Sequence, residues 1–242
     1  MALGFIGIAF LAFLSWFGLK AKMPESQVSI RKQPLSHILY DFKQVYKNKR
    51  FLGMTLALPM VSMPLMLWIA LSPVMLVEEL GFSSMQYGLA QFPVLGGLIL
   101  GNIVLIKIID KLALGQSVLI GLPIMLLGSL VLVAGVIWQD YLIWCLIAGM
   151  TLLSFGEGIS FSVLYRFALM SSEVSKGTVA AAVSMLLMFS FFFIIELVRV
   201  LYEQFHLIGY SVSCLVLIAL WFTFPRAILK QVLQERKQSG VF

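Results

Sequence analysis

A single carboxyl group stands in the middle of a long apolar stretch. Glu157 lies between Gly156 and Gly158, 16 residues or about 24 Å of helix beyond Tyr141. An ionised carboxylate at the centre of a membrane helix costs at least about 2.5 kcal/mol, so we expect Glu157 to be protonated or to face water. This makes Glu157 a candidate proton site. The alternative is a protonated side chain that hydrogen-bonds to a neighbouring helix.

Two amide side chains occupy another apolar stretch, QYGLAQFPVLGGLILGN (86–102). Gln91 and Asn102 are eleven residues apart, almost three helical turns, and form one stripe with Leu95 and Leu98. Because an unsatisfied amide in hydrocarbon is costly, the stripe predicts either the wall of a polar cavity or hydrogen bonds between helices. Gly97 and Gly101 in the same stretch form a GxxxG motif, which favours close helix packing.

Charged residues near position 200 have a spacing that predicts a structural role. Arg199 follows Glu196 by three residues and precedes Glu203 by four, as in an ion-pair ladder on one helix. No other residue set indicates catalysis, a cofactor or a metal: there is no Walker motif, and His37 and His206 stand in connections. Cys145 and Cys214 lie in apolar stretches and are interpreted as packing residues. We therefore expect a protein that is not an enzyme.

Composition sets the environment of these residues. The chain has 242 residues, 61% hydrophobic and 12% charged, with a mean hydropathy of +1.01 and a net charge of +6. Soluble domains are about 45–50% apolar and about 25% charged. The composition therefore excludes a soluble enzyme, a disordered chain and a nucleic-acid-binding protein, and predicts an all-α membrane protein with several spans.

Seven apolar segments are long enough to be transmembrane helices of about 20 residues. They are 1–19, 51–77, 84–108, 116–138, 141–165, 177–201 and 207–229. The polar stretch 20–50 is predicted to be a cytoplasmic linker. Its second half has apolar residues at helical spacing from Leu35 to Tyr46, which indicates a short helix on the membrane surface. Residues 230–242 are predicted to be a cytoplasmic tail.

Basic residues give the orientation. With seven spans, 16 of the 17 Lys and Arg residues fall on one side, and only Arg199 lies near the other. By the positive-inside rule, the N-terminus is then periplasmic and the C-terminus cytoplasmic. A lysine deep in the last segment, as a retinal protein needs, is missing, because Lys230 stands at its cytoplasmic end.

The six closely spaced segments divide into two triplets, 51–138 and 141–229. Transporters are often built from inverted triplets, and interrupted helices at corresponding positions mark their binding sites. Pro59, Pro64 and Pro73 predict interruptions in the first helix of one triplet. The first helix of the other triplet carries three glycines in corresponding places: Gly149, Gly156 and Gly158. Methionine-rich surfaces suit promiscuous binding, and two segments offer such residues: Leu65, Met66, Ile69, Met185, Met188, Phe191 and Phe192.

Several runs together resemble a known family. SMPLMLWIALSP (62–73), QYGLAQFPVLGGLILGN (86–102) and SKGTVAAAVSMLLMF (175–189) are similar to the C-terminal half of the MdfA/Cmr-type multidrug/proton antiporters of the major facilitator superfamily. The resemblance implies that segment 1–19 is the family's sixth helix and that 51–229 forms a six-helix half. It also implies export of lipophilic drugs in exchange for protons across the bacterial inner membrane.

The same resemblance implies which side chains line the drug pocket between the two halves. They are Leu65, Met66, Ile69, Gln91, Asn102 and Met188. Glu157 stands where the family is expected to have an apolar residue, so it inherits no role from the resemblance. The family's main embedded acidic residues lie in its N-terminal half. We therefore expect an N-terminally truncated efflux transporter whose partners are drugs, protons, the bilayer and the missing half.

Two other functions are considered. A half-transporter could act as a homodimer, which would bury segment 1–19 or leave it loose. A stand-alone seven-helix receptor or sensor would need an extracellular ligand surface, for which the outer connections are short.

Overall fold

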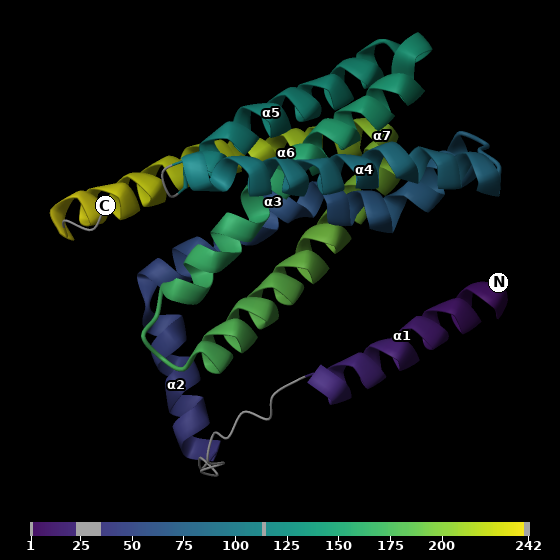
Figure 1. Ribbon diagram of the computed structural model, residues 1–242. Helices are drawn as coiled ribbons and strands as arrows, with labels where there is room; N and C mark the ends of the chain where they lie inside the picture. The colour runs from purple at the N-terminus through teal and green to yellow at the C-terminus, as the bar shows by residue number, and fades with distance from the viewer. Residues whose placement is uncertain (1, 23–34, 113–114, 240–242) are drawn as a thin grey trace. The chain divides into compact units, whose positions relative to one another are not determined.

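In a computed structural model that describes residues 2–22, 35–112 and 115–239, the described part of the protein is built of helices (Figure 1). No strand occurs in these ranges. The prediction of an all-α membrane protein is confirmed. Of the 31 residues of the predicted linker 20–50, the 12 residues 23–34 lie outside the described residues.

The chain divides into two units, Met1–Leu35 and Ser36–Phe242. The first contains α1 (Ala2–Lys22), whose 21 residues make a rod of about 31 Å. Three aromatic rings contact one another near its end, with the centroids of Phe13 and Phe17 5.1 Å apart. The Lys20 ammonium lies 5.3 Å from the centroid of the Trp16 ring, a cation–π contact.

The second unit begins with the helix that the sequence predicts around Leu35–Tyr46. This helix, α2 (Leu35–Lys47), buries Val45 completely and packs Phe42 and Tyr46 against the core. Burial raises the pKa of the Tyr46 hydroxyl above its ordinary value. The next helix, α3, starts at Lys49 because the Asn48 side chain caps it, with Oδ1 accepting from the amides of Arg50 and Phe51.

The remaining helices closely match the predicted segments. They are α4 (Ser84–Ile108), α5 (Gln116–Ile137), α6 (Leu142–Met170) and α7 (Lys176–Ser239), with 3-10 turns η2 (Ile109–Lys111) and η3 (Gln139–Tyr141). A capping box starts α4, because Ser83 and Gln86 each bond the other's backbone amide.

The proline-rich helix is less interrupted than predicted. The helix α3 (Lys49–Ser72) runs through Pro59 and Pro64 without a break, and only Pro73 changes it, into the π-helix η1 (Pro73–Glu79). Membrane helices tolerate prolines where neighbours satisfy the freed backbone groups. The expectation that Pro59 and Pro64 interrupt this helix is therefore wrong.

The glycines of α6 are packing sites. The helix α6 is continuous from Leu142 to Met170 and packs against α3, α4 and α5. A Cβ added at Gly158 would lie 2.5 Å from the Leu98 carbonyl oxygen of α4, and one at Gly149 would lie 2.8 Å from the Gly128 oxygen of α5. The expectation that glycines interrupt α6 is wrong, because they let three backbones approach closely.

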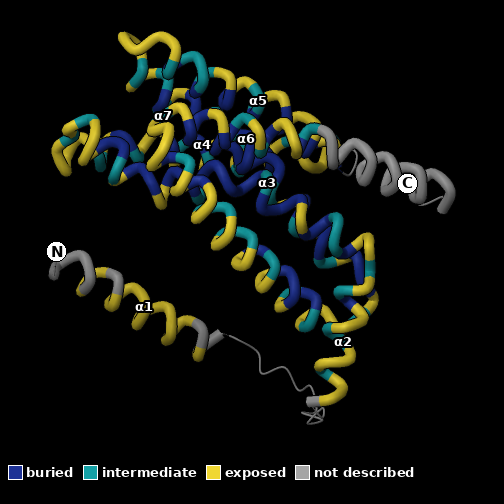
Figure 2. The backbone as a smooth tube through the Cα atoms, turned by 180° about the vertical axis from the view of Figure 1, so that it is seen from behind, coloured by how far each residue is buried: buried dark blue, intermediate teal, exposed yellow. Residues whose placement is uncertain are grey.

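Buried residues gather where α3, α4 and α6 meet, seen in dark blue in Figure 2. The largest fully buried side chains include Trp68 of α3 and Tyr210 and Trp221 of α7. The Tyr210 hydroxyl donates to the Met150 sulfur at 3.1 Å, which joins α7 to α6.

The long helix α7 is two helices joined at a sharp turn. His206 has φ 50° and ψ −138°, outside the helical region, so the chain reverses there. We call residues 176–205 the first limb and residues 207–239 the second limb. The second limb continues to Ser239, past the predicted end of the last segment at 229.

Among the described residues, five helical runs are long and apolar enough to span a membrane, and the last of them, Lys176–Phe222, holds the first limb of α7 and the beginning of the second. The described apolar part of α1 is the shorter Ala9–Gly18. The count of seven spans stays a prediction, as does the inverted-repeat relation between the triplets.

Two side-chain contacts, one at each end of the helical body, join segments that are far apart in the sequence. Asn48 Nδ2, before α3, donates to the Ser171 carbonyl oxygen after α6 at 3.0 Å. At the other end, His206 Nδ1 lies 3.1 Å from Glu79 Oε1 at the end of η1. These contacts agree with helices that alternate in direction along the chain.

Candidate functional site

A polar cluster joins α3 to α4. The Trp68 indole Nε1 donates to Gln91 Oε1 at 2.7 Å, and Gln91 Nε2 donates to Ser72 Oγ at 3.4 Å. Ser72 Oγ also lies 3.3 Å from the Tyr87 hydroxyl. Of the two roles predicted for Gln91, hydrogen bonding between helices is therefore the one that the structure displays.

Sequence reasoning missed Trp68 and Tyr87 as members of this cluster. A signal was available, because Trp68 precedes Ser72 by four residues and Tyr87 precedes Gln91 by four. Residues four apart share a helix face, so each of two consecutive helices presents a matched pair of polar groups.

Asn102 does not continue this cluster. Its Nδ2 donates to the Leu98 carbonyl oxygen of its own helix at 2.9 Å. Its backbone lies where α4 meets α6, since a Cβ at Gly158 would be 3.0 Å from the Asn102 nitrogen. The predicted stripe is thus divided: Gln91 contacts α3, and Asn102 lies at the seam with α6.

The apolar residues predicted to bind drugs differ in exposure. Leu65 is 4% exposed and belongs to the core, whereas Ile69, one turn further, is 52% exposed. Met66 is half-buried. On the first limb of α7, Met188 is 59% exposed. Ile69 and Met188 therefore present side chains that a ligand or another protein segment can contact.

Glu157 is buried within α6. Its exposed fraction is 6%, and it makes no hydrogen bond or ion pair with another described residue. Met150 precedes it by seven residues, nearly two turns, and bonds Tyr210 of α7, so Glu157 is on the side of α6 that faces the second limb. Ser154 and Ser160, three residues before and after it, have buried hydroxyls without a partner in the described part.

The predicted ion-pair ladder on α7 is confirmed. The Arg199 guanidinium bonds both Glu196 oxygens, at 3.0 Å from Nε and 2.6 Å from Nη2, and also contacts Glu203. The three side chains are exposed. Arginine bonded to two oxygens of one carboxylate is a geometrically specific pair.

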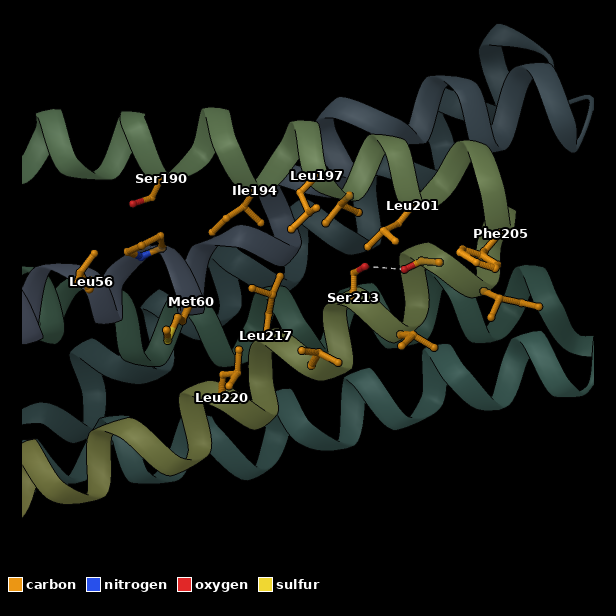
Figure 3. Close-up of a pocket in the computed structure, with 16 residues that line it drawn as sticks. Leu56, Met60, Ser190, Ile194, Leu197, Leu201, Phe205, Ser213, Leu217 and Leu220 are labelled. Carbon is orange, nitrogen blue, oxygen red and sulfur yellow. Dashed lines mark hydrogen bonds between the residues drawn. The ribbon is translucent and has the colours of Figure 1, made fainter.

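A cavity of about 730 Å³ lies between α3 and the two limbs of α7 (Figure 3). Its volume falls in the range of about 300–1,000 Å³ found for ligand sites. None of the residues predicted to bind drugs or protons lines it. Among the described residues there is also no group of His, Cys, Asp and Glu able to hold a metal.

These features define a class first: an all-α, multi-pass membrane protein whose polar groups are few and internal. The comparisons then place the chain. It is 70% identical over 233 residues to the chloramphenicol resistance protein CraA of Acinetobacter baumannii, covering 96% of this chain and 56% of that protein. No family model matches the chain.

The multidrug transporter MdfA is a more distant relative. The chain is 37% identical over 200 residues to MdfA of Yersinia pestis and 38% identical over 188 residues to MdfA of Escherichia coli. It covers 49% and 46% of those proteins, so it spans about half the length of the curated relatives it matches. The chain is thus a homologue of the MdfA-type multidrug efflux transporters, as its motifs suggested.

Proposed function

We propose that residues 49–239 form one half of a multidrug/proton antiporter in the bacterial inner membrane. The observation that carries this proposal is the 70% identity to CraA over nearly the whole chain. In such a protein, drugs bind between two halves without covalent change, and the halves rock to expose the site alternately. This half contributes a helical body with exposed apolar residues on α3 and α7, Ile69 and Met188 among them.

The orientation follows from the positions of charge. Asn48 and Ser171 mark one end of the body, where the cations Lys49, Lys107 and Lys176 also stand at helix ends. Glu79 and His206 mark the other. The positive-inside rule supports placing the first end in the cytoplasm, which makes the C-terminus cytoplasmic and the N-terminus periplasmic.

Glu157 is proposed as a proton site in this half. Its burial in a membrane helix favours the protonated form. The hydroxyls of Ser154 and Ser160, which have no partner among the described residues, can hydrogen-bond to a water beside it. The drug-facing residues are proposed to be Ile69, Met66 and Met188, with Leu65 behind them in the core. Gln91 and Asn102 are proposed as the amides that orient substrates.

A chimera tests the function. The stretch of CraA that matches this chain is replaced by the chain, and chloramphenicol resistance is measured in a strain without other exporters. We expect resistance close to that of CraA. A chimera that accumulates in the membrane but gives no resistance would overturn the proposal.

The same strain separates the alternatives. Resistance from the 242-residue chain expressed alone, together with a symmetric cross-linked dimer, would favour a homodimeric half-transporter. Substitutions in the chimera then test the drug-facing residues: Met188→Ala and Ile69→Ala should change the resistance profile across drugs with little effect on protein level, because both side chains are exposed.

A further inference from the structure

The cavity between α3 and α7 has walls without available polar groups. Its lining is apolar apart from Ser190 and Ser213. Ser190 Oγ donates to the Leu186 carbonyl oxygen at 2.7 Å, and Ser213 Oγ donates to the Gly209 oxygen at 2.6 Å, the bond drawn in Figure 3. Both hydroxyls therefore use their protons on their own helix, and a ligand in this cavity is held by apolar contact.

The cavity is a narrow groove that is closed at one end. Its lining on the first limb runs from Ser190 to Phe205, about 22 Å of helix. At the turn the limbs meet, since a Cβ at Gly209 would lie 2.5 Å from the Leu201 oxygen. Dividing the volume by this length gives a mean cross-sectional area of about 33 Å². A hydrocarbon chain, one carbon atom wide, can enter.

The groove faces away from the proposed drug pathway. Side chains two positions apart in the sequence point about 200° apart around a helix. Met188 therefore lies opposite Ser190, and Arg199 lies opposite both Leu197 and Leu201. On α3, Ile69 follows Met60 by nine residues, which again makes about half a turn of difference. The groove thus lies opposite Ile69 and Met188, the two exposed residues proposed to contact drugs, whereas half-buried Met66 lies on the same side of α3 as Pro59.

The open side of the groove lies within membrane-spanning helix. Leu197, Val212, Val216 and Leu220 line it and are exposed, and all stand in the apolar run Lys176–Phe222. A side directed away from the pathway, at this depth and without charge, faces the bilayer interior. We propose that this groove is a lipid site that holds an acyl chain of a membrane phospholipid between the limbs of α7. The proposal rests on the proposed function only for the direction in which the groove faces.

The test fills the groove and counts bound lipid. The full chain is extracted from membranes of palmitoyl-oleoyl phosphatidylethanolamine and phosphatidylglycerol, and retained phospholipids are counted by native mass spectrometry. Val216→Trp and Val212→Trp place a large ring in the groove. Val200→Trp is the matched control, because Val200 is also exposed on α7 but does not line the cavity.

We expect the unaltered chain and Val200→Trp to retain one phospholipid more than either groove variant. Added long-chain phosphatidylglycerol should compete for this position, whereas dihexanoyl phosphatidylglycerol, with the same headgroup, should not. Equal lipid counts in all variants that elute as folded monomers would overturn the proposal. A dimer of the unaltered chain that is lost in Val216→Trp would also overturn the proposal. Displacement of the lipid by chloramphenicol would overturn it as well. Because lipid retention needs no transport, its failure is distinct from failure of the chimera.

Discussion

The indole of Trp68 on α3 donates a hydrogen bond of 2.7 Å from Nε1 to Oε1 of Gln91 on α4. Trp68 is fully buried, and Gln91 is half-buried. The bond connects the first two helices of the six-helix body at a residue proposed to orient substrates. It therefore links the stability of the body to the shape of the side that is proposed to face drugs.

Loss of the Gln91 amide should destabilise the protein. Gln91→Leu removes the acceptor and leaves a buried indole N–H without a partner, which costs about 1 kcal/mol or somewhat more. We expect a lower thermal midpoint in detergent. Trp68→Phe should lower the thermal midpoint less in the Gln91→Leu variant than in the unaltered protein, since the bond is already broken. Strictly additive effects of the two changes would show that the bond contributes nothing.

Neighbouring glycines of α4 should respond in opposite ways to alanine. A Cβ at Gly97 would lie 2.5 Å from the Thr151 oxygen of α6, whereas a Cβ at Gly96 would meet nothing within 4 Å. Gly97→Ala must push the two helices apart, and we expect a loss of about 1–3 kcal/mol. Gly96→Ala should raise stability by about 0.5–1 kcal/mol, because alanine favours helix. Similar thermal midpoints for the two variants would contradict the close approach of α4 and α6.

The start of α3 offers a test of two separate bonds of one side chain. Asn48→Ala removes the helix cap and the bond to the Ser171 oxygen, so we expect a loss of about 1–2 kcal/mol in thermal unfolding. Asn48→Asp keeps the capping oxygen but has no Nδ2 donor. The thermal stability of Asn48→Asp should fall between that of the unaltered protein and that of Asn48→Ala. The difference in stability between the two variants measures the contribution of the cap. If Asp is as harmful as Ala, the cap is not what stabilises α3.

The positions of the helices could be predicted because membrane spans depend on local composition. The apolar run 84–108 coincides with α4, and 116–138 ends one residue past α5. The turn at His206 falls in the predicted connection between the last two segments, although no glycine marks it. Each of these boundaries follows from where polar residues begin, which a single sequence reveals.

Relations between helices could not be predicted in the same way. Pro59 and the glycines of α6 were expected to interrupt helices, yet their effect depends on which neighbour lies against them. Gly158 permits contact with α4 because Gly101 stands opposite, and no local pattern states that pairing. The groove likewise needs α3 and both limbs of α7 to converge, so its lining residues carry no signal in the sequence.

The last prediction concerns Glu157, the residue with which a proton could be exchanged. Glu157→Gln keeps the size and the neutral form of the buried side chain but cannot release a proton. If Glu157 carries a proton in each transport cycle, the CraA chimera with Glu157→Gln should fold normally and lose chloramphenicol resistance, together with any dependence of resistance on external pH. Glu173→Gln, the same change at an exposed site after α6, is the matched control and should keep both.

The competing interpretation makes a different forecast for the same chimera. A glutamic acid that only packs is always protonated, because an ionised carboxylate buried in a membrane helix is costly. Glutamine then replaces it with little consequence, and resistance and its pH dependence stay at the level of the Glu173→Gln control. Protein level and thermal midpoint are measured in parallel, since a fall in either would attribute lost resistance to misfolding. Full resistance with an unchanged pH profile would therefore remove Glu157 from the proton pathway and leave it as a core residue of α6.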